Sequence, residues 1–228
     1  MDNNNISFKM KFDFVNGSAF EKIKGGTYID WKPPHKVISK YKELSELGLG
    51  SLIKRQDVVL ADEFKTYSVR TCEGGLTKNS QDKRTLGFHY FDDETNYNTI
   101  GEFLKLIFNL NPNPDSAVLI GGKNLLGSKY SIPNMNIFME VFKIKIPKLT
   151  YFCDHAHPYS ETDFHYSQKD DKMTICSMFR PQKEALEHYV SSIDDLRNCY
   201  RKIHMADGDV LMINGKEVDS AQFKTNKI

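Results

Sequence analysis

The chain has 228 residues, of which 39% are hydrophobic, 27% charged and 12% aromatic. This profile is that of a globular protein and excludes an intrinsically disordered chain. Its 31 basic and 30 acidic residues leave a formal net charge of +1, which excludes the basic surface typical of proteins that bind nucleic acid or anionic membranes. The length suits one domain, residues 1–228, with a sizeable core.

Signals for export or membrane insertion are not found in this sequence. No apolar run approaches the ~18 residues needed to span a bilayer, and Met1–Asn5 lacks the basic and apolar regions of a secretory signal. The four cysteines are widely spaced and form no Cys-x-x-Cys pair: Cys72, Cys153, Cys176 and Cys199. They fit reduced, mostly buried thiols, so we expect a cytosolic protein.

The N-terminal third begins with a clear strand signal over residues 7–15, where apolar and charged side chains alternate with a period of two. Residues 16–18 (Asn-Gly-Ser) predict a turn, and residues 19–23 a strand that returns antiparallel. A short strand is expected over 27–31. A helix then opens at Pro33-Pro34 and is closed by Gly48.

The next segments predict strands over residues 57–60, 64–72 and 86–91. Residues 73–84 are polar and contain Gly74-Gly75, so we expect an exposed loop there. Thr99 and Glu102 have the spacing of a capping box in front of a helical apolar face, which is formed by Ile100, Phe103, Leu104, Ile107 and Phe108.

In the second half, residues 111–114 (Asn-Pro-Asn-Pro) end this helix. Residues 117–120 read as a buried strand, and residues 137–146 alternate as a long strand does. Residues 163–179 predict a hairpin with a polar turn over 168–172.

The C-terminal segment predicts a long helix from Pro181 to Ile203, followed by a hairpin over 209–218 that turns at Asn214-Gly215. The helix is indicated by apolar residues spaced three and four apart: Leu186, Tyr189, Val190, Ile193, Leu196, Tyr200 and Ile203. Together these elements predict an α+β fold, a mostly antiparallel β-sandwich with about three helices packed outside it.

One local cluster has the residue types of a metal site. Histidine nitrogen and carboxylate oxygen are common ligands of catalytic metals, which suggests a metal-dependent hydrolase or nuclease as one alternative. Its ligands would be Asp154, His155, His157 and His165, with Asn198 or His204 as further partners. The competing interpretation, a polar loop that happens to hold two histidines, is the commoner situation.

Three other motifs are weaker. Gly121-Gly122-Lys123 is too short for a phosphate-binding loop and predicts a turn. Residues 207–218 look like a strand pair of peptide-binding PDZ modules, but the rest of such a module is missing. Arg70 and His89 on neighbouring strands could serve a lyase or transferase, although a lone histidine on a strand is more often packed and hydrogen-bonded. No nucleophile–base pair has credible spacing, so we expect no enzyme.

Three segments resemble the polyhedrins of cypoviruses, which crystallise around virus particles inside infected insect cells. They are residues 6–28, residues 164–178, and residues 189–201 with the pattern Leu196-Arg197-x-Cys199-x-Arg201. They cover about a quarter of the chain in the same order as in that family. The sequence departs from the family in its N-terminus, because only six residues precede the first predicted strand where polyhedrins carry a helical arm.

The resemblance implies a structural protein that forms homotrimers and a crystal lattice around virus particles, in occlusion bodies in the cytoplasm of the infected host cell. It implies no catalytic or metal site and allows for a nucleotide trapped between subunits. It also implies dissolution in alkali, for which ionisation of eleven tyrosines and four cysteines and neutralisation of lysines supply a physical route. A third hypothesis is a non-catalytic effector or binding module from a pathogen.

Overall fold

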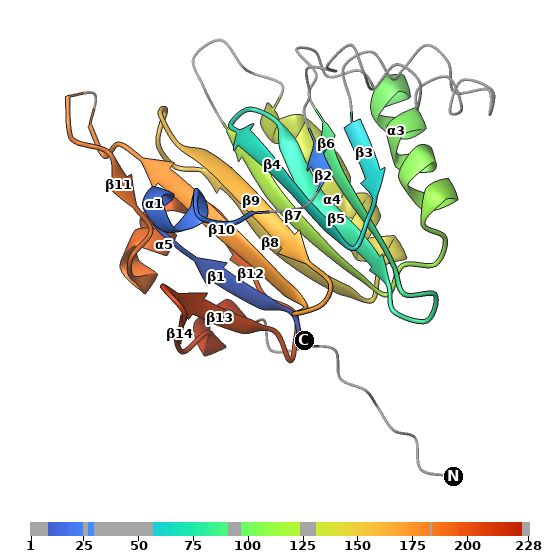
Figure 1. Ribbon diagram of the computed structural model, residues 1–228. Coiled ribbons are helices and arrows are strands. Elements are labelled where there is room, and N and C mark those ends of the chain that lie inside the picture. Colours follow the sequence, from blue (N-terminus) through green and yellow to red (C-terminus); the bar gives the residue numbers. More distant parts are fainter. Residues whose placement is uncertain are drawn as a thin grey trace.

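The computed structural model describes residues 9–24, 27–29, 57–90, 97–123, 131–182 and 184–224. Two β-sheets pack face to face, and helices cover the outer face of the second sheet (Figure 1). The predicted α+β class and sandwich architecture are therefore confirmed. The predicted helix at residues 33–48 lies outside the described residues.

The first sheet has eight strands, in the order β14 (Lys216–Glu217), β13 (Val210–Ile213), β1 (Lys11–Phe14), β10 (Lys172–Phe179), β9 (Glu161–Ser167), β4 (Glu63–Val69) and β2 (Thr27–Ile29), with β11 (His188–Tyr189) paired to β10. The second has six, in the order β12 (Tyr200–His204), β8 (Lys148–His155), β7 (Ser116–Lys123), β5 (Glu73–Asn79), β6 (Arg84–Tyr90) and β3 (Asp57–Leu60). Both predicted hairpins, β9–β10 and β13–β14, are present.

Parallel pairs interrupt the expected antiparallel pattern. β1 lies between β10 and β13 and is parallel to both, and β2 with β4 and β7 with β8 are also parallel pairs. The N-terminal strand is therefore held by segments far away in the sequence. Met10, Phe12 and Phe14 lie in the core as predicted, and Asp13 on the opposite face is buried as well.

Aromatic side chains fill the space between the sheets. The ring of Phe152 on β8 lies 5.5 Å from that of Phe12 and 5.1 Å from that of Phe14, both on β1. Each such fully buried side chain contributes roughly 1.5–3 kcal/mol through removal of apolar surface from water. These contacts join the two sheets across the sandwich.

Two helices cover the outer face of the second sheet: α3 (Tyr97–Leu110) and α4 (Ser131–Lys145). α3 begins two residues before the predicted cap Thr99 and ends, as predicted, before Asn111. Within the described ranges, no helix is long and apolar enough to cross a bilayer.

The prediction of a strand at residues 137–146 was wrong, because residues 137–145 belong to α4 and Ile146 directly follows it. Alternating apolar residues satisfy a period of two here, but the buried side chains follow the helical spacing of three and four instead. They are Met135, Phe138, Met139, Phe142 and Ile146.

The prediction of an exposed loop at residues 73–84 was wrong for residues 73–79, whereas residues 80–83 do form a turn and residues 81–84 are exposed. Residues 73–79 form β5, which is buried at every position between β6 and β7. A Cβ atom on Gly75 would lie 2.0 Å from the carbonyl oxygen of Val118, so this close approach of backbones requires glycine. The glycines in this segment therefore serve close strand packing and do not indicate an exposed loop.

The segment after β1 forms a helical turn and not the predicted return strand. α1 (Gly17–Phe20) is capped by Asn16, whose side-chain oxygen accepts a hydrogen bond from the Ala19 amide at 2.9 Å. Asparagine is a favoured N-cap residue because it satisfies an otherwise free amide of the first turn.

The long helix predicted over residues 181–203 is replaced by β11, the short helix α5 (Ile193–Cys199) and β12. The hydroxyl of Ser192 caps α5 by accepting from the Asp195 amide at 3.1 Å. Tyr200 then pairs with His155 of β8, so the end of the apolar stripe completes the second sheet. The 3₁₀ turn η3 (Ala221–Phe223) follows near the C-terminus.

Candidate functional site

The four residues of the predicted metal site do not converge. His155 is buried between the sheets, where its Nε2 lies 3.2 Å from Thr162 Oγ1. His165 lies on β9 of the other sheet and is bonded to Glu63 at 2.9 Å. His157 stacks on Phe179 at 5.4 Å between ring centroids, and burial lowers its pKa. Among the described residues, no three His, Cys, Asp or Glu side chains form a group that could hold a metal ion.

Asp154 explains why His155 points into the sandwich. Residues two apart on a strand normally share a face, yet Cys153 lies on the helix-covered side and His155 contacts Tyr200 between the sheets. Asp154 has a φ of +63°, and this left-handed residue turns the strand over. Its carboxylate lies 3.7 Å from the guanidinium of Arg201. The predicted ligand therefore has a role in shaping the backbone.

A cluster of hydroxyl groups surrounds His155 and was not found by sequence reasoning. Tyr200 Oη lies 2.6 Å from Thr162 Oγ1 and 2.5 Å from Ser177 Oγ, and these two oxygens are 3.1 Å apart. All three side chains are buried, and burial raises the pKa of Tyr200 well above its ordinary value. Because these buried hydroxyl groups form hydrogen bonds with one another, the cluster stabilises the sandwich.

The other predicted pair is also separated. Arg70 is exposed and paired with Glu161, whereas His89 is fully buried and bonded to Thr66 at 2.7 Å. The remaining predicted metal partners lie apart: the Asn198 side chain is exposed, and His204 packs on Tyr151 with a pKa that burial lowers. Gly121 and Gly122 end strand β7 with positive φ angles and do not form a separate turn.

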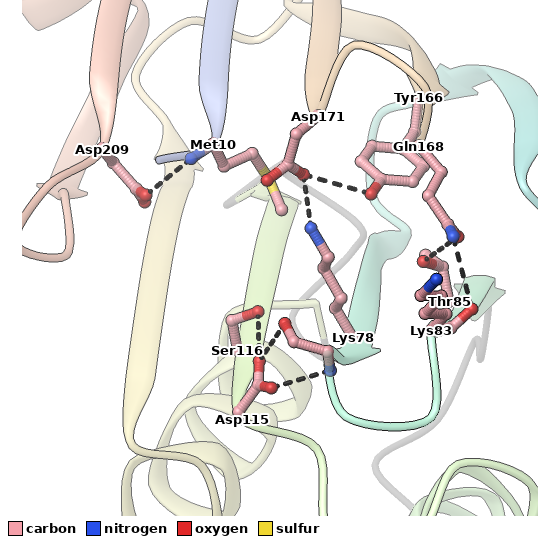
Figure 2. Close-up of polar contacts among 11 residues, drawn as sticks. Met10, Lys78, Lys83, Thr85, Asp115, Ser116, Tyr166, Gln168, Asp171 and Asp209 are labelled. Carbon is pink, nitrogen blue, oxygen red and sulfur yellow. Dashed lines mark hydrogen bonds and ion pairs between the residues drawn. The ribbon is translucent and has the colours of Figure 1, made fainter. Parts of the chain in front are cut away.

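A cavity at one open end of the sandwich is the best-formed candidate site. Its lining residues lie at or just before the starts of β1, β7, β8, β10 and β13 and at the end of β5, and its volume is about 280 Å³. Figure 2 shows several of these residues and their polar contacts. The charged lining residues are Lys78, Asp115, Lys148, Asp171 and Asp209. We call this site the end cavity. Sequence reasoning missed it because its residues are spread from Met10 to Asp209.

One wall of the end cavity carries a buried ion pair. Lys78 Nζ donates to Asp171 Oδ1 at 2.7 Å, and the hydroxyl of Tyr166 donates to the same oxygen at 3.2 Å (Figure 2). Burial, together with the negative charge of Asp171, raises the pKa of Tyr166. Gln168 in the β9–β10 turn accepts from Thr85 at 3.0 Å, which ties the two sheets together beside this wall.

The opposite wall carries Asp209. Its carboxylate accepts from the Met10 amide at 3.2 Å and from Thr150 Oγ1 at 2.6 Å, while the Thr150 oxygen itself accepts from the Ala206 amide. Asp209 is only 8% exposed, and burial raises its pKa to about 6. Within the part of the chain that the structure describes, no cation lies within ion-pair distance of this carboxylate.

A second hollow lies at the surface, beside a projecting loop. Its volume is about 360 Å³, and it is lined by Arg70, Pro158, Tyr159, Glu161, Met178, Arg180 and Glu187. We call it the side hollow. The loop between β10 and β11, here called the arm (residues 180–182 and 184–187), projects beyond the body of the molecule (Figure 1). Within the arm, Leu186 is 84% exposed.

Comparison with known proteins does not place the chain in a family: no protein-family model matches it, and no curated protein matches it. Its function is therefore argued from the geometry of the described residues.

Proposed function

We propose that this protein is a non-catalytic structural protein that binds copies of itself and builds an ordered matrix. The observation that carries this proposal is the arm, which presents Leu186 to solvent at 84% exposure. A large aliphatic side chain on a projecting loop costs free energy in water, and burying it against another molecule recovers roughly 1.5–3 kcal/mol. The resemblance to cypovirus polyhedrins supports the same role.

The side hollow is a suitable place for Leu186 of a second copy. Tyr159, which is 50% exposed, and Met178 offer apolar surface there. Its two arginines are matched by two glutamates, in the pairs Arg70–Glu161 and Arg180–Glu187. The hollow is therefore electrically neutral and does not repel a neighbour, and the chain's net charge of +1 adds little repulsion.

This contact would repeat. An arm that enters the hollow of a neighbour leaves its own hollow open to the next copy, and such head-to-tail contacts close into rings or continue as an array. A homotrimer that grows into a lattice is one such arrangement. As the resemblance implies, we propose that assembly takes place in the cytoplasm of an infected cell, around virus particles.

The test is the state of the purified chain as its concentration rises. We expect sedimentation to show growing oligomers for the wild type, and light microscopy to show dense particles in cells that express the chain alone. Leu186→Ser should weaken association about tenfold or more, because it removes most of the apolar surface that the contact buries.

Ile144→Ser is the matched control. Ile144 is 80% exposed on α4, far along the chain from the arm, so its replacement should leave association unchanged. If Ile144→Ser abolishes association and Leu186→Ser does not, the arm is not the contact. A wild-type chain that stays monomeric at every concentration contradicts the whole proposal and favours a binding module.

A further inference from the structure

We propose that the end cavity is a binding site for a small primary ammonium ion with a short alkyl chain, held by the carboxylate of Asp209. This site is independent of self-association, because its residues lie at the other end of β10 from the arm. The site is indicated by a buried carboxylate that forms no ion pair with any described residue and by the shape and lining of the space beside it.

Asp209 is a carboxylate above pH about 6, because burial raises its pKa to about that value. One oxygen accepts from the Met10 amide, and the other accepts from the Thr150 hydroxyl, whose own oxygen accepts from the Ala206 amide. Yet a buried carboxylate without a contacting cation is costly. A cation that enters from the cavity offsets this cost.

The charges of the lining favour a cation over an anion. Three aspartates face two lysines, so the lining carries one net negative charge. One of the lysines, Lys78, is already neutralised by Asp171 at 2.7 Å. Lys148 acts on Asp209 through its charge without forming an ion pair with it. Asp115 is occupied by Ser80, whose amide donates to it at 2.7 Å.

The remaining lining is apolar and selects an organic cation. Five residues supply carbon surface: Met10, Ala117, Val118, Pro147 and Ala206. A cavity of about 280 Å³ exceeds the space of a single metal ion and suits a short alkyl chain. No group of three metal-ligand side chains is found among the described residues, which also favours an ammonium ion over a metal ion.

The probe is n-butylammonium chloride, titrated into the full chain at pH 8 in amine-free phosphate buffer and followed by NMR. We expect saturable shifts of residues lining the end cavity and a lower pKa of Asp209 in the complex. Binding should weaken as the pH falls through about 6, where the free carboxyl takes up its proton. n-Butanol, which has the same chain without the charge, should bind at least about tenfold more weakly.

Two variants and one control decide the assignment. Asp209→Asn should weaken binding at least about tenfold, and Lys148→Met at the half-exposed rim should tighten it roughly twofold to fivefold by removing a like charge. Asp163→Asn is the matched control: burial raises the pKa of this carboxyl to about 6 too, but it lies outside the cavity.

The proposal is overturned if butylammonium does not saturate, if butanol binds equally well, or if Asp163→Asn weakens binding as much as Asp209→Asn. Circular dichroism checks that each variant is folded. Should Asp209→Asn fail to fold, the direction of the Lys148→Met effect decides, since unchanged or weaker binding by that variant contradicts a cation in the cavity.

Discussion

At the residue scale, the hydrogen bonds around His89 determine which of its ring nitrogens carries the proton. The hydroxyl of Thr66 donates to the carbonyl oxygen of Ile29 at 2.8 Å, so the ring Nδ1–H of His89 must donate to Thr66 Oγ1 at 2.7 Å. Burial lowers the pKa of His89 to about 4, so the ring is neutral at pH 7 and carries its proton on Nδ1. Since the unfolded chain takes up this proton more readily, His89 makes stability fall as the pH drops from about 6.5 to about 4.

We predict that Thr66→Val lowers the free energy of unfolding by about 1–3 kcal/mol, because it leaves the Ile29 carbonyl and the ring N–H of His89 without partners. Denaturation with urea at pH 7 measures the loss. Thr174→Val is the control, since Thr174 is also buried on a strand but its side chain forms no hydrogen bond with any residue that the structure describes. Equal losses of unfolding free energy in both variants would argue against a stabilising role of the hydrogen bonds from His89 through Thr66 to Ile29.

At the element scale, β5 is the strand on which the second sheet depends. It pairs with β6 on one side and β7 on the other, and its glycines allow close approach of neighbouring strands and of Phe164. Thr77 at its centre accepts from the side chain of Asn111 at 2.9 Å, which links the end of α3 to the strand. This element therefore connects the helical layer to the sandwich core.

Gly75→Ala tests this packing, because its Cβ would meet the backbone oxygen of Val118 at 2.0 Å and the backbone cannot move aside locally. We expect a loss of about 3 kcal/mol or more in the free energy of unfolding. Gly101→Ala on α3 is the matched control: nothing lies within 4 Å of its Cβ, and alanine should stabilise the helix by about 0.5–1 kcal/mol. A tolerated Gly75→Ala would contradict the buried position of β5.

At the scale of the whole molecule, the structure changes how alkali is expected to act. The sequence suggested that every tyrosine and cysteine ionises in the assembled protein. Instead, burial raises the pKa of Cys72 and of Cys176 to about 12, and it also raises the pKa values of Cys153, Tyr166 and Tyr200. These groups ionise far more readily in the unfolded chain, so alkali acts on the fold itself.

The direction of this pH dependence of stability follows from the number of protons bound by the folded and unfolded chains. Above the ordinary pKa values of 9.0 and 10.0, the folded chain holds protons that the unfolded chain releases, so stability is present below that range and is lost as the pH rises. We predict that Tyr200→Phe makes this decline shallower by up to about 1.4 kcal/mol per pH unit above pH 10. Urea midpoints at several pH values measure the slope.

Tyr159→Phe is the control for that experiment, because the Tyr159 side chain is half exposed. It should leave the alkaline slope unchanged. A wild-type protein whose stability is constant between pH 9 and pH 11 would contradict the linkage.

Local patterns were sufficient for several strands and turns. The period of two in β1 and in the β9–β10 hairpin, and the Asn214-Gly215 turn with φ angles of +50° and +77°, could all be predicted from the sequence. So could the α+β class and the sandwich, because many short alternating segments have few other ways to bury their apolar faces.

Only the tertiary structure decided the rest. Residues 137–146 suit a strand or a helix equally well, and the covered face of the second sheet selected the helix. β5 looks like a loop until β6 and β7 surround it. The end cavity joins Met10, Lys78 and Asp209, which no local pattern connects. Buried charges and pairings of distant strands depend on which segments meet in space, and that is a property of the whole chain.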